Sequence, residues 1–233
     1  MKPNEYNYLT ADDYNTIYYR FLKWSPEELL VLAGMKEGYL VVDLCCGANA
    51  RLTLSALEMG AQMVASVDRT QHVMDIKTKV IPEQHRHKVC AFCEPVTSFL
   101  ESCPKNKDID IVACRQGINY FFNDMKHTHW QSLVKILKDD GAFVFNTFRI
   151  LPPTRPVVKE YFNKGKNFNE IYWSVGSTVH HVQIMEGYPP HVTTFDHITN
   201  EEYENTLRKY FNRVDIVSRE HTDIYTCREP IRK

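Results

Sequence analysis

Short apolar runs recur along the first two thirds of the chain, and the stretches between them are long enough for helices. The runs are continuous rather than alternating, which is typical of strands that are buried on both faces of a parallel sheet. A strand-helix rhythm of this kind predicts right-handed crossovers and a doubly wound α/β fold. The expected strands cover residues 40–45, 63–67, 89–92, 109–114 and 142–148.

The segments that flank this core predict additions to it. Residues 11–24 carry Tyr and other apolar side chains at three- and four-residue spacing, which indicates an amphipathic helix. Ser25-Pro26-Glu27-Glu28 has the pattern of a capping box, so a second helix is expected to end near Ala33. We therefore expect an N-terminal helical cap.

The rhythm changes after Phe148, where Leu151-Pro152-Pro153 interrupts it. Residues 171–186 and 191–198 look like strands with no helix between them, which predicts an inserted antiparallel sheet. A helix over 200–211 and a hairpin of 213–218 and 223–227 are expected to follow.

The length of 233 residues, of which 43% are hydrophobic, fits one domain around one core. We expect a mostly parallel seven-stranded sheet with helices on both faces. The expected parts are a helical cap over 1–36, a ligand-binding core over 37–148, an inserted sheet over 149–198 that serves as lid or dimer contact, and a closing helix and hairpin over 199–233.

The charge balance disfavours nucleic acid as a partner, because 28 Lys and Arg residues face 29 Asp and Glu residues. No stretch approaches the roughly 18 apolar residues that a membrane span needs. The chain opens on polar residues. A cytoplasmic protein that binds no membrane is the expectation.

The seven cysteines are expected to be reduced thiols, since Cys45, Cys46 and Cys114 lie in or beside apolar runs. A zinc site is the alternative, and its ligands would be His85, His87, Cys90 and Cys93. A strand over 89–92 would send Cys90 and Cys93 to opposite faces, so we expect no metal.

The turn after the first expected strand reads Asp43-Leu44-Cys45-Cys46-Gly47-Ala48-Asn49-Ala50. A dinucleotide site needs three glycines there, and Gly47 is the only one, which argues against NAD or FAD. Asp68 ends the next expected strand, where a carboxylate can accept hydrogen bonds from the ribose of an adenosine-containing ligand.

This pattern resembles the class I S-adenosylmethionine (AdoMet)-dependent methyltransferases, and the resemblance covers residues 38–148. Cys45 and Asn49 stand where that family's first motif has its first and last glycines, and asparagine tolerates a left-handed backbone. The resemblance implies AdoMet as cofactor and S-adenosylhomocysteine as product. The residues it implies for cofactor binding are Asp43, Cys45, Gly47, Asn49, Asp68, Arg69, Glu94, Pro95 and Arg115.

Methyl transfer is an in-line displacement, so the protein mainly positions the acceptor and excludes water. The segment after the fourth strand is expected to meet the acceptor there. The expected acceptor-side residues are Gln116, Asn119 and Tyr120, with Tyr14 and Tyr19 from the cap, and the candidate catalytic residues are Tyr18, His181 and His191. The alternatives are that the cap tyrosines only pack, that residues 119–120 only begin a helix, and that the histidines lie on the surface.

The expected function is therefore methylation of an N or O atom of a small-molecule acceptor. Two alternatives stay open: a catalytically inactive AdoMet-binding regulatory protein, which the two glycine replacements allow, and a methyltransferase that acts on a protein. The chain lacks an Asn-Pro-Pro-Tyr motif after the fourth strand, as base and glutamine methylators use. The inserted sheet is also a candidate homodimer contact.

Overall fold

The structure is a computed structural model of the chain, and it describes residues 26–148, 152–163, 166–186, 190–219 and 222–232. The predicted cap helix over 11–24 lies outside these residues. Among the described helices, none is both long and apolar enough to cross a membrane.

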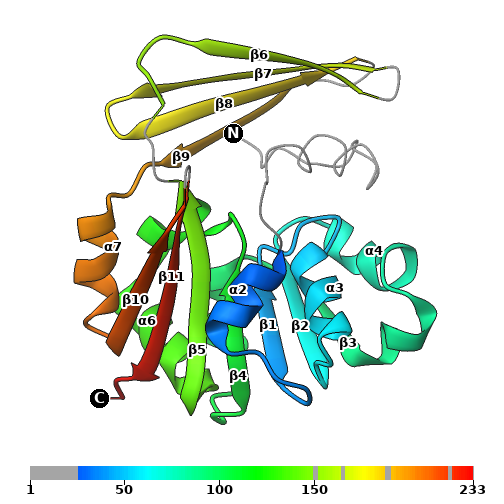
Figure 1. Cartoon of the computed structure of the whole chain (residues 1–233), viewed down its shortest axis with the longest axis vertical. Helices are drawn as coiled ribbons and strands as arrows, with labels where there is room; N and C mark the ends of the chain where they lie inside the picture. The colour runs from blue at the N-terminus through cyan, green and yellow to red at the C-terminus, as the bar shows by residue number, and fades with distance from the viewer. Residues whose placement is uncertain (1–25, 149–151, 164–165, 187–189, 220–221, 233) are drawn as a thin grey trace.

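The described residues include eleven strands, which form two sheets (Figure 1). The seven-stranded sheet has the order β10-β11-β5-β4-β1-β2-β3. Its strands are β1 (Leu40–Leu44), β2 (Met63–Asp68), β3 (Val89–Cys93), β4 (Ile109–Cys114), β5 (Leu137–Phe148), β10 (Phe211–Ser218) and β11 (Thr222–Pro230). β1 to β5 pair in parallel, whereas β11 is antiparallel to both of its neighbours. The doubly wound, mostly parallel sheet is confirmed.

Two hydrophobic clusters cover the two faces of this sheet, because successive strand residues point to opposite sides. One cluster joins α2 (Pro26–Ala33), α3 (Arg51–Glu58) and α4 (His72–Lys79) to one face. The other joins α5 (Val96–Ser102), α6 (His127–Ile136) and α7 (Asn200–Leu207) to the other face. The short 3-10 turns are η1 (Glu83–Lys88), η2 (Ile118–Tyr120) and η3 (Phe122–Asp124).

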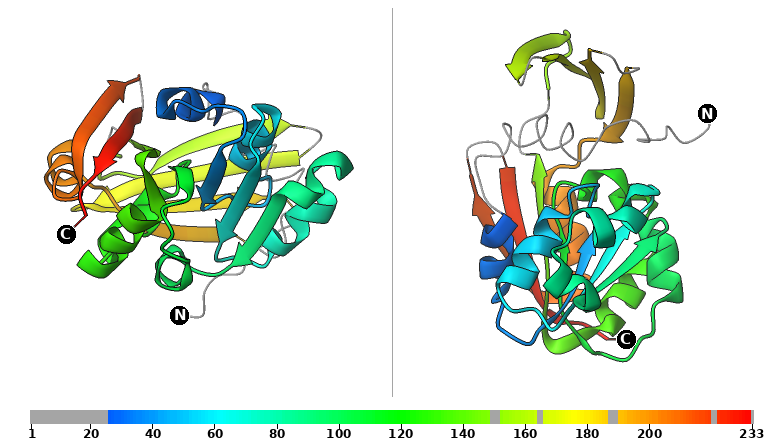
Figure 2. Two further views of the ribbon diagram at one scale, coloured as in Figure 1. Left: turned by 90° about the horizontal axis from the view of Figure 1, so that it is seen from below. Right: turned by 90° about the vertical axis from the view of Figure 1, so that its right-hand side faces the viewer.

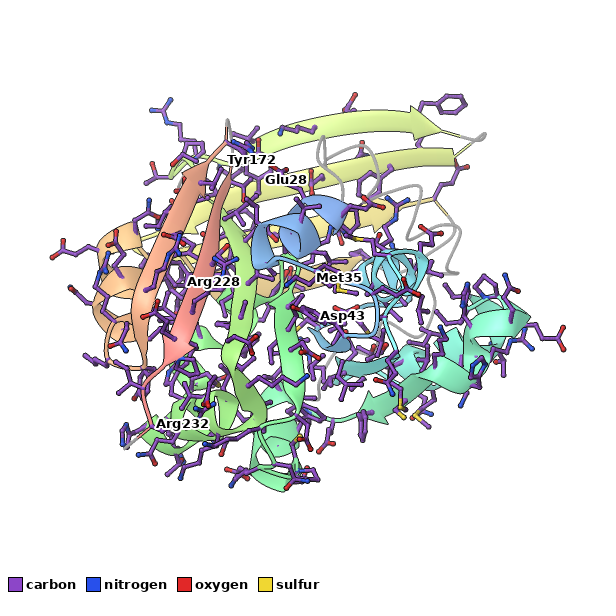
Figure 3. The ribbon with its side chains drawn as sticks, turned by 60° about the horizontal axis from the view of Figure 1, so that its bottom comes forward. Glu28, Met35, Asp43, Tyr172, Arg228 and Arg232 are labelled. Atoms are coloured by element: carbon purple, nitrogen blue, oxygen red, sulfur yellow. The ribbon has the colours of Figure 1, made fainter. Side chains whose placement is uncertain are left out.

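Helix α2 is fixed to the far part of the sheet by two arginines. Arg228 of β11 donates to the Leu32 carbonyl at 2.5 Å, and Arg219 donates to the Glu28 carboxylate at 2.5 Å. Figure 3 labels Glu28 on α2 and Arg228 on the neighbouring β11. These contacts join residues that are far apart in the sequence.

A four-stranded antiparallel sheet, β6-β7-β8-β9, forms a separate layer over one end of the large sheet (Figures 1 and 2). Its strands are β6 (Val157–Asn163), β7 (Lys166–Val175), β8 (Thr178–Met185) and β9 (His191–Asp196). The end that it covers is the carboxyl end of β5, where β5 points toward it. The predicted inserted antiparallel sheet is thus confirmed.

Several boundaries differ from the sequence prediction. The run 171–186 is not one strand, because Gly176 takes a φ of 60° and turns the chain between β7 and β8. The helix predicted to reach residue 211 ends at Leu207, since Phe211 is buried in the core and opens β10. β6 was not predicted, and β11 is longer than expected.

β5 begins at Leu137 instead of residue 142, with an irregular register against β4 around Gly141. A Cβ on Gly141 would stand 3.0 Å from the carbonyl oxygen of Ile109. The strand passes too close to β4 there for a side chain, which is why glycine occupies the irregularity.

Candidate active site

The candidate active site lies at the carboxyl ends of four neighbouring strands, β4, β1, β2 and β3. Each of these strands ends near a charged residue: Arg115 after β4, Asp43 within the end of β1, Asp68 at the end of β2 and Glu94 after β3. Parallel strands bring these ends to one edge of the sheet, and this is where ligands bind in open α/β folds. Residues far apart in the sequence therefore meet here.

Asp43 is a buried carboxylate with one satisfied and one unsatisfied oxygen. Its Oδ2 accepts from the hydroxyl of Thr53 at 2.7 Å and from the Thr53 amide at 3.0 Å. Its Oδ1 is buried and has no hydrogen-bond partner among the described residues. Burial raises the pKa of Asp43 to about 7, although the Thr53 hydrogen bonds and the charge of Arg115 oppose that rise. An additional donor would therefore stabilise the ionised form.

The turn after β1 is held in an unusual backbone conformation. Cys45, Gly47 and Ala50 have φ values of 57°, 65° and 43°, in the left-handed region. Asn49 could tolerate this conformation but does not adopt it, and the strain falls on Cys45 and Ala50 instead. Asn49 is buried in the turn. A left-handed non-glycine residue costs free energy, and such strain concentrates at functional sites.

Asp68 closes this turn from the end of β2. Its Oδ2 accepts from the Gly47 amide at 3.0 Å, and its Oδ1 accepts from the amide and hydroxyl of Thr70 at 2.9 and 2.8 Å. A carboxylate offers about four acceptor positions, so three are in use. Asp68 thus joins the two loops on which a donor ligand would lie.

The other predicted cofactor residues lie beside Asp68. The amide of Glu94 donates to the Asp68 carbonyl at 3.0 Å, so the ends of β2 and β3 are held together. Pro95 is exposed and precedes the first turn of α5, and Arg69 is exposed after β2. Glu94 is half-buried at this edge.

The segment after β4 turns sharply toward the four-stranded sheet. Gln116 has a φ of 58°, and its amide donates to Oδ1 of the buried Asn146 on β5 at 2.9 Å. Asn119 and Tyr120 form the short turn η2, not the start of a longer helix. Oδ1 of Asn119 is buried and has no hydrogen-bond partner among the described residues.

Turn η2 is also the place where the four-stranded sheet contacts the core. The rings of Tyr120 and Phe195 meet edge to face with their centroids 5.3 Å apart. Asn123 donates to the Asp196 carboxylate at 3.0 Å, and Asn119 contacts the Asp196 carbonyl at 3.5 Å. β9 is thereby fixed over the end of β4.

Tyr120 lies between the turn after β1 and the small sheet. Burial raises the pKa of its phenol, and the nearby Thr193 side chain of β9 opposes the rise. The negative charge of Glu170 on β7 also raises this pKa, while the positive charge of Arg69 lowers it. Groups from three separate segments thus surround one hydroxyl.

His181 forms an ion-pair contact on the small sheet, since its Nε2 lies 2.5 Å from Oε1 of Glu170. Its neighbour His180 points the other way and stacks on Trp173 with centroids 4.9 Å apart. For His191 only the backbone is described, and it pairs with Gln183. Tyr14, Tyr18 and Tyr19 lie outside the described residues.

Four residues that contact the predicted ones were not predicted from the sequence, namely Glu170, Thr193, Phe195 and Asn146. Phe168, Glu170 and Tyr172 are spaced two residues apart along β7, so their side chains share one face of the strand. This spacing was the sequence signal that Glu170 faces the same way as its apolar neighbours. That signal was hidden because the turn at Gly176 was not recognised. The hairpin of β7 and β8 brings Glu170 beside His181, so the contact could not be predicted without it.

All seven cysteines are free. Cys90 and Cys93 are exposed on β3, and the Cys93 thiol lies 3.6 Å from the Gln71 side chain. Within the described ranges, no three His, Cys, Asp or Glu side chains are grouped so that they could hold a metal ion.

No protein-family model matches the sequence, and neither does any curated protein. Solved structures do match over nearly the whole chain. An S-adenosylmethionine-dependent methyltransferase from Clostridium acetobutylicum is 15% identical, with a TM-score of 0.67 and coverage of 94% of this chain and 96% of the other.

Two further matches are named for their reactions. CalS10, an amino pentose methyltransferase from Micromonospora echinaspora, is 13% identical, with a TM-score of 0.64 and coverage of 92% and 96%. The 1,6-didemethyltoxoflavin-N1-methyltransferase of Burkholderia thailandensis is 17% identical, with a TM-score of 0.54 and coverage of 94% and 86%. The chain therefore has the fold that these S-adenosylmethionine-dependent methyltransferases share.

Proposed function

We propose that this protein is an AdoMet-dependent methyltransferase that transfers the methyl group to a nitrogen or oxygen atom of a small-molecule acceptor. The observation that carries the proposal is the convergence of Asp43, Asp68, Glu94 and Arg115 at four adjacent strand ends in a methyltransferase fold. Asp43 alone could be structural, but the four together provide one charged or polar group for each part of the donor.

The donor is proposed to lie along this edge with its ribose at Asp68. Asp68 has one acceptor position left, and it can exchange the Thr70 hydroxyl for a ribose hydroxyl. Glu94 and Pro95 are proposed to contact the adenine, with Arg69 at its outer side. Asp43 and Arg115 suit the ammonium and carboxylate of the methionine part, because Oδ1 of Asp43 has no other donor among the described residues.

The turn of Cys45, Gly47 and Asn49 fits a nucleoside better than a dinucleotide. A pyrophosphate needs free backbone amides, and here the Gly47 amide is already bonded to Asp68. The Ala50 amide likewise contacts the Gly47 carbonyl. This supports AdoMet over NAD or FAD as the ligand.

The acceptor is proposed to lie between this edge and the four-stranded sheet, with Gln116, Asn119 and Tyr120 on one side and His181 on the other. A sheet that covers the strand ends favours a small acceptor over a folded protein (Figure 1). Two proteins of the same fold are named for methylation of an amino pentose and of 1,6-didemethyltoxoflavin. Tyr14, Tyr18, Tyr19 and His191 remain predicted contributors.

The chemistry that the bound donor supplies is an electrophilic methyl group on a sulfonium. The protein's part is to align the acceptor's lone pair with the carbon–sulfur bond and to keep water out. The two sheets, joined through Tyr120 and Phe195, can provide both functions.

A crystal structure of the complex with S-adenosylhomocysteine tests this placement. The expected result has the ribose hydroxyls on Asp68 and the homocysteine amine within hydrogen-bond distance of Asp43. A ligand bound away from the ends of β1 and β2, or a protein that does not bind it at all, would contradict the proposal.

A further inference from the structure

The contact between Glu170 and His181 is a largely buried ion-pair contact on the four-stranded sheet. The side chains of Glu170 and His181 are 11% and 14% exposed. A carboxylate and an imidazole lose solvation when they are buried, so such a pair needs either a structural or a chemical reason.

The strand registers place this pair on the face of the small sheet that meets the core. Tyr172 of β7 and Thr193 of β9 stand directly beside His181 in the two ladders, so the three side chains share one face. Thr193 lies near the Tyr120 phenol and lowers its pKa, and Phe195, two residues further along β9, packs on the same ring. Figure 3 labels Tyr172 on this sheet and Asp43 on β1 below it.

Glu170 determines which nitrogen of His181 carries the proton. An ionised Glu170 only accepts hydrogen bonds, so Nε2 of a neutral His181 must donate to it. The lone pair of the imidazole then lies on Nδ1. Among the described residues, Nδ1 has no hydrogen-bond partner. An imidazole held in one tautomer by a carboxylate is the arrangement that general bases use.

We propose that His181 accepts a proton from the methyl acceptor, that Glu170 positions it for this role, and that the acceptor is an amine. This inference rests on the proposed methyltransferase function. It adds the proton acceptor, its positioning residue and the acceptor's chemical class.

The surroundings favour an amine over a phenol. Burial disfavours charged forms, so it keeps the proton on a phenol but removes it from an ammonium group. The structure holds a phenol in this place, and burial indeed raises the pKa of Tyr120. An ammonium group would also gain from the negative charge of Glu170 and from the ring of Tyr120.

Other charged groups also lie near this face. Lys159 of β6 stands opposite Glu170 in the β6–β7 ladder; its side chain is exposed, and its ammonium lies over the Tyr172 ring, 4.9 Å from the centroid, so that ring already carries a cation. On the core side, the charge of Arg69 is near enough to Tyr120 to lower the pKa of its phenol. No further charged side chain described on β8 or β9 faces His181.

The proposed step conserves atoms and charge. The ammonium form of the acceptor gives one proton to Nδ1 of His181, which leaves a neutral amine. The amine's lone pair attacks the methyl carbon of AdoMet, a nitrogen–carbon bond forms, and the carbon–sulfur bond breaks with its electrons on sulfur. The products are a methylated ammonium and S-adenosylhomocysteine, and His181 then releases its proton to solvent.

Nitrogen-15 NMR of the histidine side chains tests the pair without an identified acceptor. In the wild-type protein, with or without S-adenosylhomocysteine, His181 is expected as the Nε2–H tautomer. Glu170→Gln should give a mixture of tautomers, whereas Glu160→Gln, on the opposite face of the sheet, should leave His181 unchanged. An Nδ1–H tautomer in the wild type, or no change in Glu170→Gln, would overturn the positioning role.

A series of small amines and size-matched phenols then tests the acceptor class on the S-adenosylhomocysteine complex. Methylamine, ethanolamine, glucosamine and tyramine are the amine probes, and phenol and 4-ethylphenol are the matched phenols. At least one amine should move the Nδ1 resonance of His181. If no amine does so, or if only phenols do, the amine assignment is overturned.

Turnover of the amine that binds completes the test. With AdoMet, His181→Gln should lower kcat by about 100-fold or more and remove the pH dependence that reports the base. His180→Gln, which changes the adjacent outward-facing histidine, should retain wild-type kcat. An unchanged pH profile in His181→Gln would overturn the catalytic role. A wild-type protein that binds no S-adenosylhomocysteine would instead count against the proposed function, and the tautomer measurement would still test the pair.

Discussion

The side chain of Cys45 occupies the space that a Cβ on residue 117 would need. A methyl group at Gly117 would stand 2.4 Å from the Cβ of Cys45 and 2.8 Å from its Sγ. Cys45 stands where the related motif has its first glycine. The larger side chain at residue 45 is thus accommodated because residue 117, after β4, is a glycine. This explains how the loop tolerates cysteine in place of the motif's first glycine.

Gly117→Ala is therefore expected to destabilise the protein by about 1–3 kcal/mol, because the added methyl group overpacks a buried site. The φ of −103° at Gly117 is accessible to alanine, so backbone strain contributes little. Urea unfolding measures the change. In a Cys45→Gly background the same substitution should cost far less, and equal costs in the two backgrounds would show that the two residues are not coupled.

Asp68→Ala is expected to weaken binding of S-adenosylhomocysteine by about 1.5–3 kcal/mol, the scale of hydrogen bonds to a charged group. Asp68 also holds Gly47 and Thr70, so a loss of affinity alone does not prove ribose contact. Ligands that lack one ribose hydroxyl separate the two roles. The wild-type protein should bind the deoxy analogues more weakly than it binds S-adenosylhomocysteine. The Asp68→Ala variant should bind the deoxy analogues and S-adenosylhomocysteine with the same affinity. If the variant still prefers S-adenosylhomocysteine, the ribose lies elsewhere.

The raised pKa of Asp43 predicts a pH-dependent stability. Burial raises that pKa from about 4 to about 7, so the folded state favours the protonated form. The stabilisation from this group is complete below pH 4 or so and is lost as the pH rises to about 7, by up to roughly 4 kcal/mol. The Asp43→Asn variant should not lose this stability. Unfolding free energies of the wild type and the variant, measured between pH 4 and pH 7, test this.

The exposed Asp75→Asn serves as the control for that comparison, because Asp75 pairs only with Lys79 on the surface of α4. Its stability should follow the wild-type dependence on pH. Parallel curves for wild type and Asp43→Asn between pH 4 and 7 would mean that Asp43 is not protonated in the folded state.

Asp196 is expected to control how firmly the small sheet is held on the core. Its carboxylate bonds Asn123 and Thr178, and its carbonyl contacts Asn119. Asp196→Ala should increase amide hydrogen exchange across β8 and β9 while exchange in β1 and β4 stays slow. Thr194→Ala, at an exposed position of β9, is the control. Uniform acceleration in both sheets would indicate global destabilisation instead.

The sequence predicted the large sheet well because its strands are continuous apolar runs with few alternative structures. Asp43 and Asp68 were placed correctly at strand ends for the same reason: Asp43 lies near the end of such a run, and Asp68 closes the next one. The small sheet was predicted less accurately. Its strands alternate between apolar and polar residues, and one turn residue, Gly176, decides the register of β7 against β8.

Long-range compensation was not predictable from one sequence. Cys45 and Gly117 lie in separate segments, and so do Gln116 and Asn146, and their relation depends on how β1, β4 and β5 are packed. Asparagine tolerates the left-handed region, yet the chain places that conformation at Cys45 and Ala50 and not at Asn49. Packing of the whole turn overrode the preference of a single residue.

Calorimetric titration with S-adenosylhomocysteine tests the central claim most directly. Binding of one ligand per chain with a micromolar dissociation constant, and no detectable heat with NAD under the same conditions, is the predicted result. A protein that binds neither S-adenosylhomocysteine nor AdoMet, or that binds NAD instead, would contradict the account.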